Sequence, residues 1–245
     1  MITRNNYLTR RAVLGGSMAI FALPAMAAEE YRIYQFVDYY DKDRNAISIL
    51  GRFPADKEDI DRALEIAGEL AKIKDPFRIM EALSKCKDSG PKSGEKYNER
   101  WKKTFNPLIS LFFHDIGCNA FAEDDCTPWC AATLSWCFLK AKKDTKLKYP
   151  ASSQDFLGHG VPVDDKDLKE GDICILTLPG NKTRGHVGFW MAGSEEEGWV
   201  DILGANQRGI LPTSCPARDT YQTSVCIQRY DINRGGFALS GFRRI

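Results

Sequence analysis

The stretch 125–140, DCTPWCAATLSWCFLK, constrains the fold most, because it places a cysteine at the start of a predicted helix. Thr127 can cap this helix, and Pro128 fits its first turn, where a missing N–H group costs nothing. Cys130 then falls in the first turn, where free backbone N–H groups and the helix dipole favour a thiolate over a thiol. We therefore expect a Cys130 pKa below the free-cysteine value of about 8.5. The helical period puts the sulfur at the rim of the buried face, where it can meet groups from a sheet.

Apolar residues at helical spacing also precede this stretch. They predict helices over residues 56–73, 76–86 and 99–115. The polar segment 87–96, KDSGPKSGEK, predicts an exposed loop and the best internal boundary. Residues 30–51 are interpreted as short and partly extended.

Short strands are expected after the cysteine helix and a loop-rich crossing at 149–169. They are predicted at residues 171–178, 186–192, 199–203, 224–230 and 241–245. Their hairpin-length spacing favours a mostly antiparallel sheet. One buried helix followed by a meander of strands predicts an α+β fold.

The composition excludes some partners. The chain has 245 residues, of which 43% are hydrophobic and 27% charged, as is usual for a globular protein. Its 34 basic and 33 acidic residues leave a net charge of +1. No global field therefore favours nucleic acid or an acidic membrane surface, and specificity must come from a local site.

The first 27 residues are typical of an export signal. They have a basic start, an apolar run at 12–23 and the small-residue sequence Ala25-Met26-Ala27. The pair Arg10-Arg11 resembles the twin-arginine type. We expect this segment to be removed and the mature chain to be periplasmic or secreted. An uncleaved membrane anchor is the alternative, although the apolar run is short for a span.

The chain has eight cysteines, and an exported location would permit disulfides. Two pairs are candidates from their positions beside loops: Cys118 with Cys126, and Cys215 with Cys226. Cys137 and Cys174 lie on apolar faces and are expected to be small buried hydrophobes.

A base for the thiol is expected at His186, in the sequence RGHVG. Gly185 and Gly188 remove side chains that would crowd a neighbouring backbone or a substrate. Strand alternation puts His186, Gly188 and Trp190 on one face, opposite Val187 and its alternate neighbours. We expect the imidazole to stand over open space. A core histidine with ordinary hydrogen bonds is the structural alternative.

A third polar group would orient this imidazole. The amide oxygen of Asn206 could accept the second ring N–H of His186, as in Cys-His-Asn sites. Asp201 is the rival for this role. Asn206 has a second interpretation, as a turn residue that tolerates left-handed backbone.

Five short motifs together resemble a known family. They are TPWCAA at 127–132, GDI at 171–173, GHVGF at 185–189, LGANQ at 203–207 and GFRR at 241–244. Their types and order look like the NlpC/P60 and CHAP group of papain-like peptidoglycan hydrolases, over about residues 124–245. Ala205 stands where the family commonly has a second glycine, and Thr133-Leu134-Ser135 where it commonly has Phe-Val-Asn.

The resemblance implies a papain-like α+β fold and a cysteine peptidase or amidase. Cys130 would be the nucleophile, His186 the base and Asn206 the orienting group. The substrate would be an amide bond of peptidoglycan peptides, cut through a thioester, without a cofactor or metal. Three further residues would contact substrate: Trp129, Trp190 and Gln207. The implied division is a signal peptide at 1–27, an N-terminal helical region at 28–96 and a CHAP-like domain at 97–245.

Three other functions remain open. A zinc site could use His114, Cys118, Cys126 and Cys130, although their spacing departs from the usual zinc knuckles. A module on the same fold could bind or inhibit at the cell wall without catalysis. A papain-like enzyme could also act on proteins or transfer acyl groups, because fold does not fix substrate.

Overall fold

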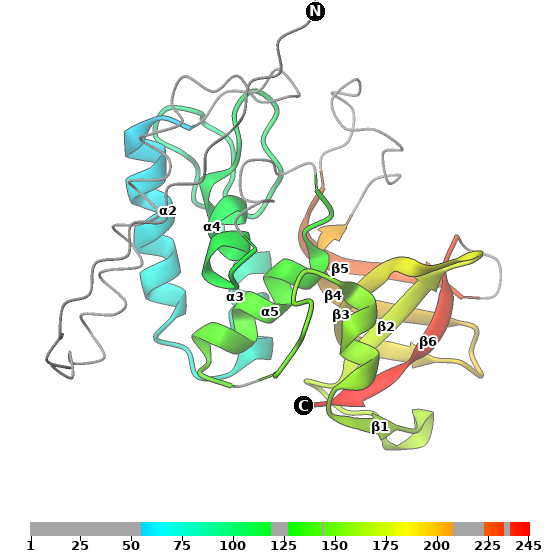
Figure 1. Cartoon of the computed structure of the whole chain (residues 1–245). Coiled ribbons are helices and arrows are strands. Elements are labelled where there is room, and N and C mark those ends of the chain that lie inside the picture. Colours follow the sequence, from blue (N-terminus) through cyan, green and yellow to red (C-terminus); the bar gives the residue numbers. More distant parts are fainter. Residues whose placement is uncertain (1–54, 119–126, 144, 208–222, 233–235) are drawn as a thin grey trace, which may run out of the picture.

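The fold joins a group of helices to one antiparallel sheet, and both α3 (Pro76–Ser84) and α5 (Cys130–Lys140) pack against the sheet (Figure 1). The computed structural model describes residues 55–118, 127–143, 145–207, 223–232 and 236–245. The predicted signal peptide, the segment 30–51, Cys126 and Cys215 lie outside the described residues. The two candidate disulfides therefore stay predictions.

The predicted helices are present, with shorter bounds. Within the described residues the α-helices are α2 (Lys57–Leu70), α3 (Pro76–Ser84), α4 (Pro107–Asp115) and α5 (Cys130–Lys140). Asp75 caps α3 by accepting hydrogen bonds from the backbone N–H groups of Phe77 and Arg78. This cap and the proline in the first turn explain why α3 begins where the sequence predicts.

Helix α4 begins later than predicted, at Pro107 instead of residue 99. A proline disfavours helical backbone at the residue before it, so a helix cannot readily run through Asn106. Asn106 instead caps α4, with its Oδ1 accepting from Leu108 N at 2.9 Å. Its Nδ2 donates to the carbonyls of Tyr97 and Glu99, which fixes the non-helical segment before the cap.

Helix α5 begins at Cys130, so the predicted cap at Thr127 and helical Pro128 are wrong. Trp129 occupies the cap position and makes no side-chain cap bond. Thr127 lies two residues before this cap position. Cys130 is therefore the first residue of the helix, two positions closer to its start than in a helix that begins at Pro128.

The sheet is antiparallel throughout its described pairs, as the strand spacing predicts. Its strands are β1 (Val161–Val163), β2 (Ile173–Leu178), β3 (Asn181–Ser194), β4 (Trp199–Gln207), β5 (Ser224–Asp231) and β6 (Ala238–Arg244). Their order across the sheet is β1-β6-β2-β3-β4-β5. The edge strand β1 was not predicted, and β4 continues through the residues expected to form a turn. Two 3-10 helices, η2 (Ser153–Gly158) and η3 (Asp165–Asp167), flank β1.

The two faces of the sheet have different partners. Val187 and Phe189 of β3 join the core that the helices form, and Phe189 packs against Phe77 of α3 and Phe138 of α5 at ring distances of 5.5 and 6.0 Å. The other face carries a second apolar cluster: Cys174, Leu176, Val200, Ile202, Tyr230 and Phe242. The alternation predicted for β3 is thus confirmed, as is the burial of Cys137 and Cys174.

The segment 87–96 forms a loop, as predicted, but it is folded onto α2. Buried Asp59 accepts hydrogen bonds from the backbone N–H groups of Lys92 and Ser93 at 2.8 and 3.1 Å. Ser89 and Lys96 form a bridge across the loop. One apolar core contains residues from both sides of position 96, so packing is continuous across the expected boundary.

Asp172 and Arg244 connect two of the sequence motifs. Arg244 donates from Nε and Nη2 to the two carboxylate oxygens of Asp172, each at 2.7 Å. Asp172 is buried and precedes β2, whereas Arg244 ends β6. This bidentate pair fixes the end of the chain beside the start of β2, so both motifs have a structural role.

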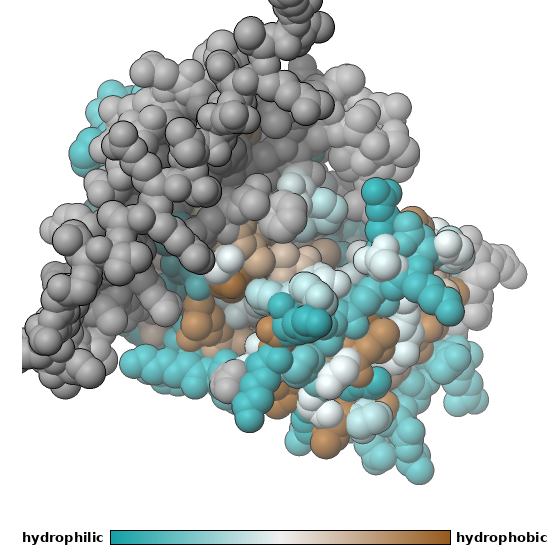
Figure 2. Space-filling model, viewed as in Figure 1, coloured by the Kyte–Doolittle hydropathy of each residue, from teal (hydrophilic) through white to brown (hydrophobic). Residues whose placement is uncertain are grey.

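On the face shown in Figure 2, polar and apolar side chains are interspersed over the sheet. Among the described residues, no helix combines the length and apolar character needed to cross a bilayer.

Glycines of contrasting surroundings test this packing. A Cβ at Gly188 would lie 2.7 Å from Leu203 O and 2.6 Å from Ile202 Cγ2, which confirms its close approach to β4. We expect Gly188→Ala to lower the free energy of unfolding by about 1–3 kcal/mol, because the strands must separate. Gly68 lies in α2 with nothing within 4 Å of an added Cβ. Gly68→Ala should raise stability by about 0.5–1 kcal/mol. Urea unfolding of both variants measures the difference; equal effects would contradict the packing of β3 against β4.

Candidate active site

The Cys130 thiol lies where the head of α5 meets β3. Besides its own N–H group and that of Ala131, the sulfur interacts with the backbone N–H of Val187. The pairing of β3 with β4 reaches only to Phe189 opposite Leu203, so Val187 lies beyond the last pair. The end of the β3–β4 ladder therefore gives the sulfur access to a backbone donor of β3.

Burial dominates the acidity of this thiol. Cys130 is 4% exposed, and the loss of water raises its pKa to about 11. The three backbone N–H groups lower the pKa, but their effect is smaller than the rise that burial causes. The expected lowering of the pKa is thus wrong, although the sulfur does lie at the helix start.

The imidazole of His186 is also buried, at 4% exposed, and does not stand over open space as expected. Its ring lies 5.2 Å from the ring of Tyr230 and 6.4 Å from that of Phe237. Burial lowers its pKa to about 4, and a hydrogen bond to Gln207 only partly opposes this. At neutral pH the imidazole is therefore uncharged.

Gln207, not Asn206, binds His186. His186 Nε2 and Gln207 Oε1 are 3.1 Å apart, and the Tyr230 hydroxyl donates to the same oxygen at 3.0 Å. The amide nitrogen of Gln207 donates to the carbonyls of Ile202 and Gly204, at 3.2 and 3.0 Å, and to that of Cys226. Gln207 binds the imidazole, and with 1% of its surface exposed it does not offer the substrate contact that we expected.

A local irregularity of β4 explains this difference of one position. Asn206 has φ of +58°, so it takes the left-handed backbone that asparagine tolerates. The register of β4 against β5 shifts between Gly204 and Gln207. Because such a bulge changes which side chain faces inward, Gln207 takes the place that simple alternation gives to Asn206.

In the part of the chain that the structure describes, no hydrogen bond joins the Cys130 thiol to the His186 imidazole. Cys130 interacts with the backbone of Val187, the neighbour of His186, and its thiolate would also act on the ionisation of Tyr230. Among the described residues, the hydrogen bond of the His186 ring is the one to Gln207. Both groups are neutral at rest, so they form no thiolate–imidazolium pair.

The remaining predicted site residues are the two tryptophans and Asp201. Trp129 is fully buried and cannot line an open groove. Trp190 is half-buried on the His186 face of β3, where its Nε1 donates to Gly193 O at 2.8 Å. Asp201 pairs with Arg229 through two bonds of 2.8 Å and does not orient the imidazole.

Tyr230 and the role of Gln207 were not predicted from the sequence. A tyrosine in a strand is common, and no motif singled out Tyr230. Gln207 could have been found only from the left-handed backbone at Asn206, which the sequence allows but does not require.

The residues proposed for zinc are not brought together as a complete set. Cys126 lies outside the described residues, and in the described ranges no group of three or more His, Cys, Asp or Glu side chains could hold a metal ion.

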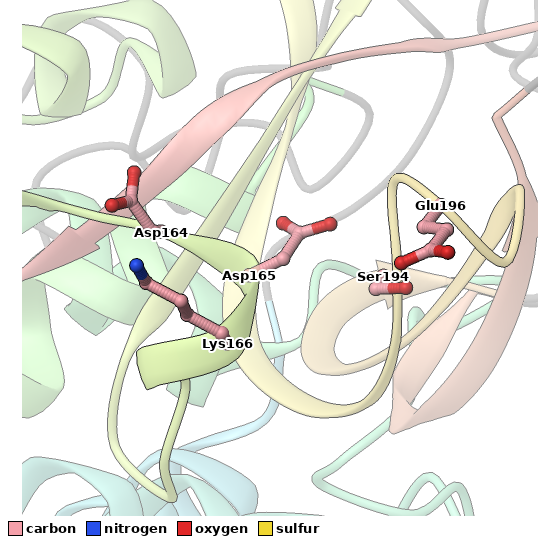
Figure 3. Close-up of a pocket in the computed structure, with 5 residues that line it drawn as sticks. All are labelled: Asp164, Asp165, Lys166, Ser194 and Glu196. Carbon is pink, nitrogen blue, oxygen red and sulfur yellow. The ribbon is translucent and has the colours of Figure 1, made fainter.

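A pocket of about 470 Å³ lies away from Cys130 and His186, between η3 and the β3–β4 hairpin. Figure 3 shows its polar lining: Asp164, Asp165, Lys166, Ser194 and Glu196. Asp165 accepts a hydrogen bond from the backbone N–H of Glu195, so the pocket joins two loops. Its lining holds no nucleophile paired with a base.

No family model, curated protein or solved structure matches the chain in the comparisons made.

Burial of neutral His186 should make stability depend on pH. The folded-state pKa, about 4, lies below the usual 6.5, so the unfolded chain binds this proton first as the pH falls. The stabilisation is present above pH 6.5 and is lost as the pH falls toward 4. We expect a loss of about 2 kcal/mol between pH 7 and pH 5, absent in His186→Asn. Urea unfolding at pH 7 and at pH 5 measures the change in the free energy of unfolding. An equal change in wild type and in His186→Asn would contradict the buried imidazole.

Alkylation should report the raised pKa of Cys130. We expect its rate with iodoacetamide to keep rising above pH 9, because the thiolate forms only near pH 11. Mass spectrometry of the Cys130 peptide gives the rate at each pH, with glutathione in the same buffers as the reference. A midpoint at or below the free value of about 8.5 would instead support activation by the helix start.

Proposed function

We propose that this chain is an exported cysteine hydrolase that cleaves amide bonds in peptidoglycan peptides. The observation that carries the proposal is the placement of Cys130 as the first residue of α5, in contact with Val187 beside His186. A nucleophile at a helix start, next to a strand that supplies an imidazole, is the arrangement that acyl transfer needs. The order of the five motifs supports a papain-like fold of the NlpC/P60 and CHAP kind.

The chemistry begins from neutral groups. Gln207 occupies Nε2 of His186, so Nδ1 is the ring nitrogen available as the base. As Sγ of Cys130 attacks the amide carbon, its proton moves to Nδ1 and the carbonyl electron pair moves to oxygen. N–H groups in the first turn of α5, that of Cys130 among them once the sulfur has attacked, would stabilise this oxyanion.

The second half of the reaction releases the products. The C–N bond breaks, the imidazolium returns its proton to the leaving amine, and a thioester remains on Cys130. Water then attacks the thioester while His186 takes a proton, and the thiol is restored with a new carboxylate. No cofactor is needed for these steps.

The helices upstream of α5 support its position. Both α3 and α4 pack against α5, and the carboxylate of Asp115 in α4 accepts bonds from Trp136 and Lys140 of α5, each at 2.9 Å. We propose that α3, which lies within the region 28–96, contributes to holding the nucleophile helix. The export signal would bring the enzyme to the periplasm or beyond the cell, where its substrate lies.

A second candidate is a module that binds or inhibits at the cell wall without catalysis. The burial of both Cys130 and His186 favours it, because a substrate must reach a thiol that is 4% exposed. This function would be supported if wild type binds the cell wall but cleaves no bond in it, and if a variant that still folds loses this binding.

Digestion of purified peptidoglycan tests the hydrolase. We expect wild type to release fragments with new amine and carboxylate ends, identified by mass spectrometry. Cys130→Ala should lower the rate at least about a thousandfold, since the nucleophile is lost. Cys86→Ala is the matched control, because Cys86 is a half-buried cysteine outside the site. If wild type and Cys130→Ala give the same fragments, the proposal fails.

The same assay separates the two amides of β4. Gln207→Leu should reduce turnover strongly, because His186 loses its partner, whereas Asn206→Ala should stay within a few fold of wild type. The reverse order would restore Asn206 as the orienting group.

A further inference from the structure

The amide of Gln207 has a defined orientation. Its Nε2 faces the carbonyl oxygens of Ile202, Gly204 and Cys226. An amide oxygen in that place would meet three acceptors and no donor, which is unfavourable for a buried group. Oε1 therefore points to the other side, toward His186 and Tyr230.

Two donors share this one oxygen. Oε1 can only accept, so it takes the hydrogen of His186 Nε2 and that of the Tyr230 hydroxyl, over 3.1 and 3.0 Å. The neutral imidazole thus carries its proton on Nε2 and its lone pair on Nδ1. Burial raises the pKa of Tyr230, so its hydroxyl remains a donor through the usual pH range.

The bond to Gln207 is the main contact that favours protonation of His186. Burial acts against the imidazolium, and the hydrogen bond to Gln207 acts for it. Tyr230 of β5 is the titratable neighbour of the His186 ring, and the charges that would act on Tyr230 are those of Cys130 of α5, Cys174 of β2 and Cys226 of β5. Burial also raises the pKa of the Cys130 and Cys174 thiols, so these remain uncharged at neutral pH.

We propose that Tyr230 is a positioning residue that controls how strongly Gln207 holds His186, and through it the basicity of Nδ1. A carbonyl oxygen that accepts two hydrogen bonds binds each donor less strongly than one that accepts a single bond. The hydroxyl of Tyr230 thereby weakens the hydrogen bond from His186 Nε2–H to Gln207. The ring of Tyr230 lies 5.2 Å from the imidazole and limits the orientations that the imidazole can take. The consequence for catalysis rests on the proposed function, whereas the effect on the imidazole does not.

Titration of His186 by ¹⁵N NMR in wild type, Tyr230→Phe and Tyr149→Phe tests this role. Tyr230→Phe keeps the ring and removes the competing donor, so the bond to the imidazolium should strengthen. We expect the His186 pKa to rise by about half a unit to one unit. Tyr149 is 59% exposed and remote from this network, so Tyr149→Phe should titrate as wild type does.

The outcomes distinguish this inference from the proposed function. A His186 pKa in Tyr230→Phe equal to or below that of wild type overturns it, even if the chain proves to be a hydrolase. A raised pKa in a chain that cleaves no peptidoglycan supports it and removes the hydrolase proposal. If Tyr230→Phe does not fold, NMR of the wild-type protein still tests the inference. The Tyr230 hydroxyl proton should then exchange slowly with water and lie next to the Nε2 proton of His186. A rapidly exchanging hydroxyl, or a proton on Nδ1 instead of Nε2, overturns the inference.

Discussion

The site depends on the packing of α5 against the helix-facing side of the sheet. Phe138 of α5 and Phe77 of α3 both pack on Phe189 of β3, and this apolar contact brings the head of α5 to the backbone of Val187. Cys130, the first residue of the same helix, is 4% exposed. Burial therefore sets the low acidity of its thiol, and the helix start cannot compensate for the lost hydration.

A neutral, desolvated pair favours a particular kind of chemistry. Separated charges are costly where the surroundings are apolar, so a preformed thiolate and imidazolium would be unfavourable beside Val187 and Tyr230. In the proposed reaction, proton transfer from Cys130 to His186 during attack would avoid a long-lived ion pair. The hydrogen bond from Nε2 to Gln207 then matters most at the moment when the imidazole becomes charged.

Local patterns in the sequence were sufficient for much of this architecture. The apolar period gave α2 and α3, and alternation gave the two faces of β3. The late start of α4 follows from Asn106 and Pro107, whose cap and turn preferences outweigh the apolar spacing upstream. The burial of Cys130 and His186 could not be predicted in the same way, because it depends on residues from several elements that meet only in the folded chain.

The hydrogen bond of His186 goes to Gln207 and not to Asn206, one position away from the residue that the motif indicates. Both side chains end in an amide, so chemistry does not distinguish them; the left-handed backbone at Asn206 and the register shift of β4 do. Once Gln207 faces inward, three carbonyls fix its nitrogen, and its oxygen is left for His186 and Tyr230. The position of the imidazole is thus set by backbone geometry in β4 and β5, and a transfer of residue roles by sequence position alone is least secure where φ becomes positive.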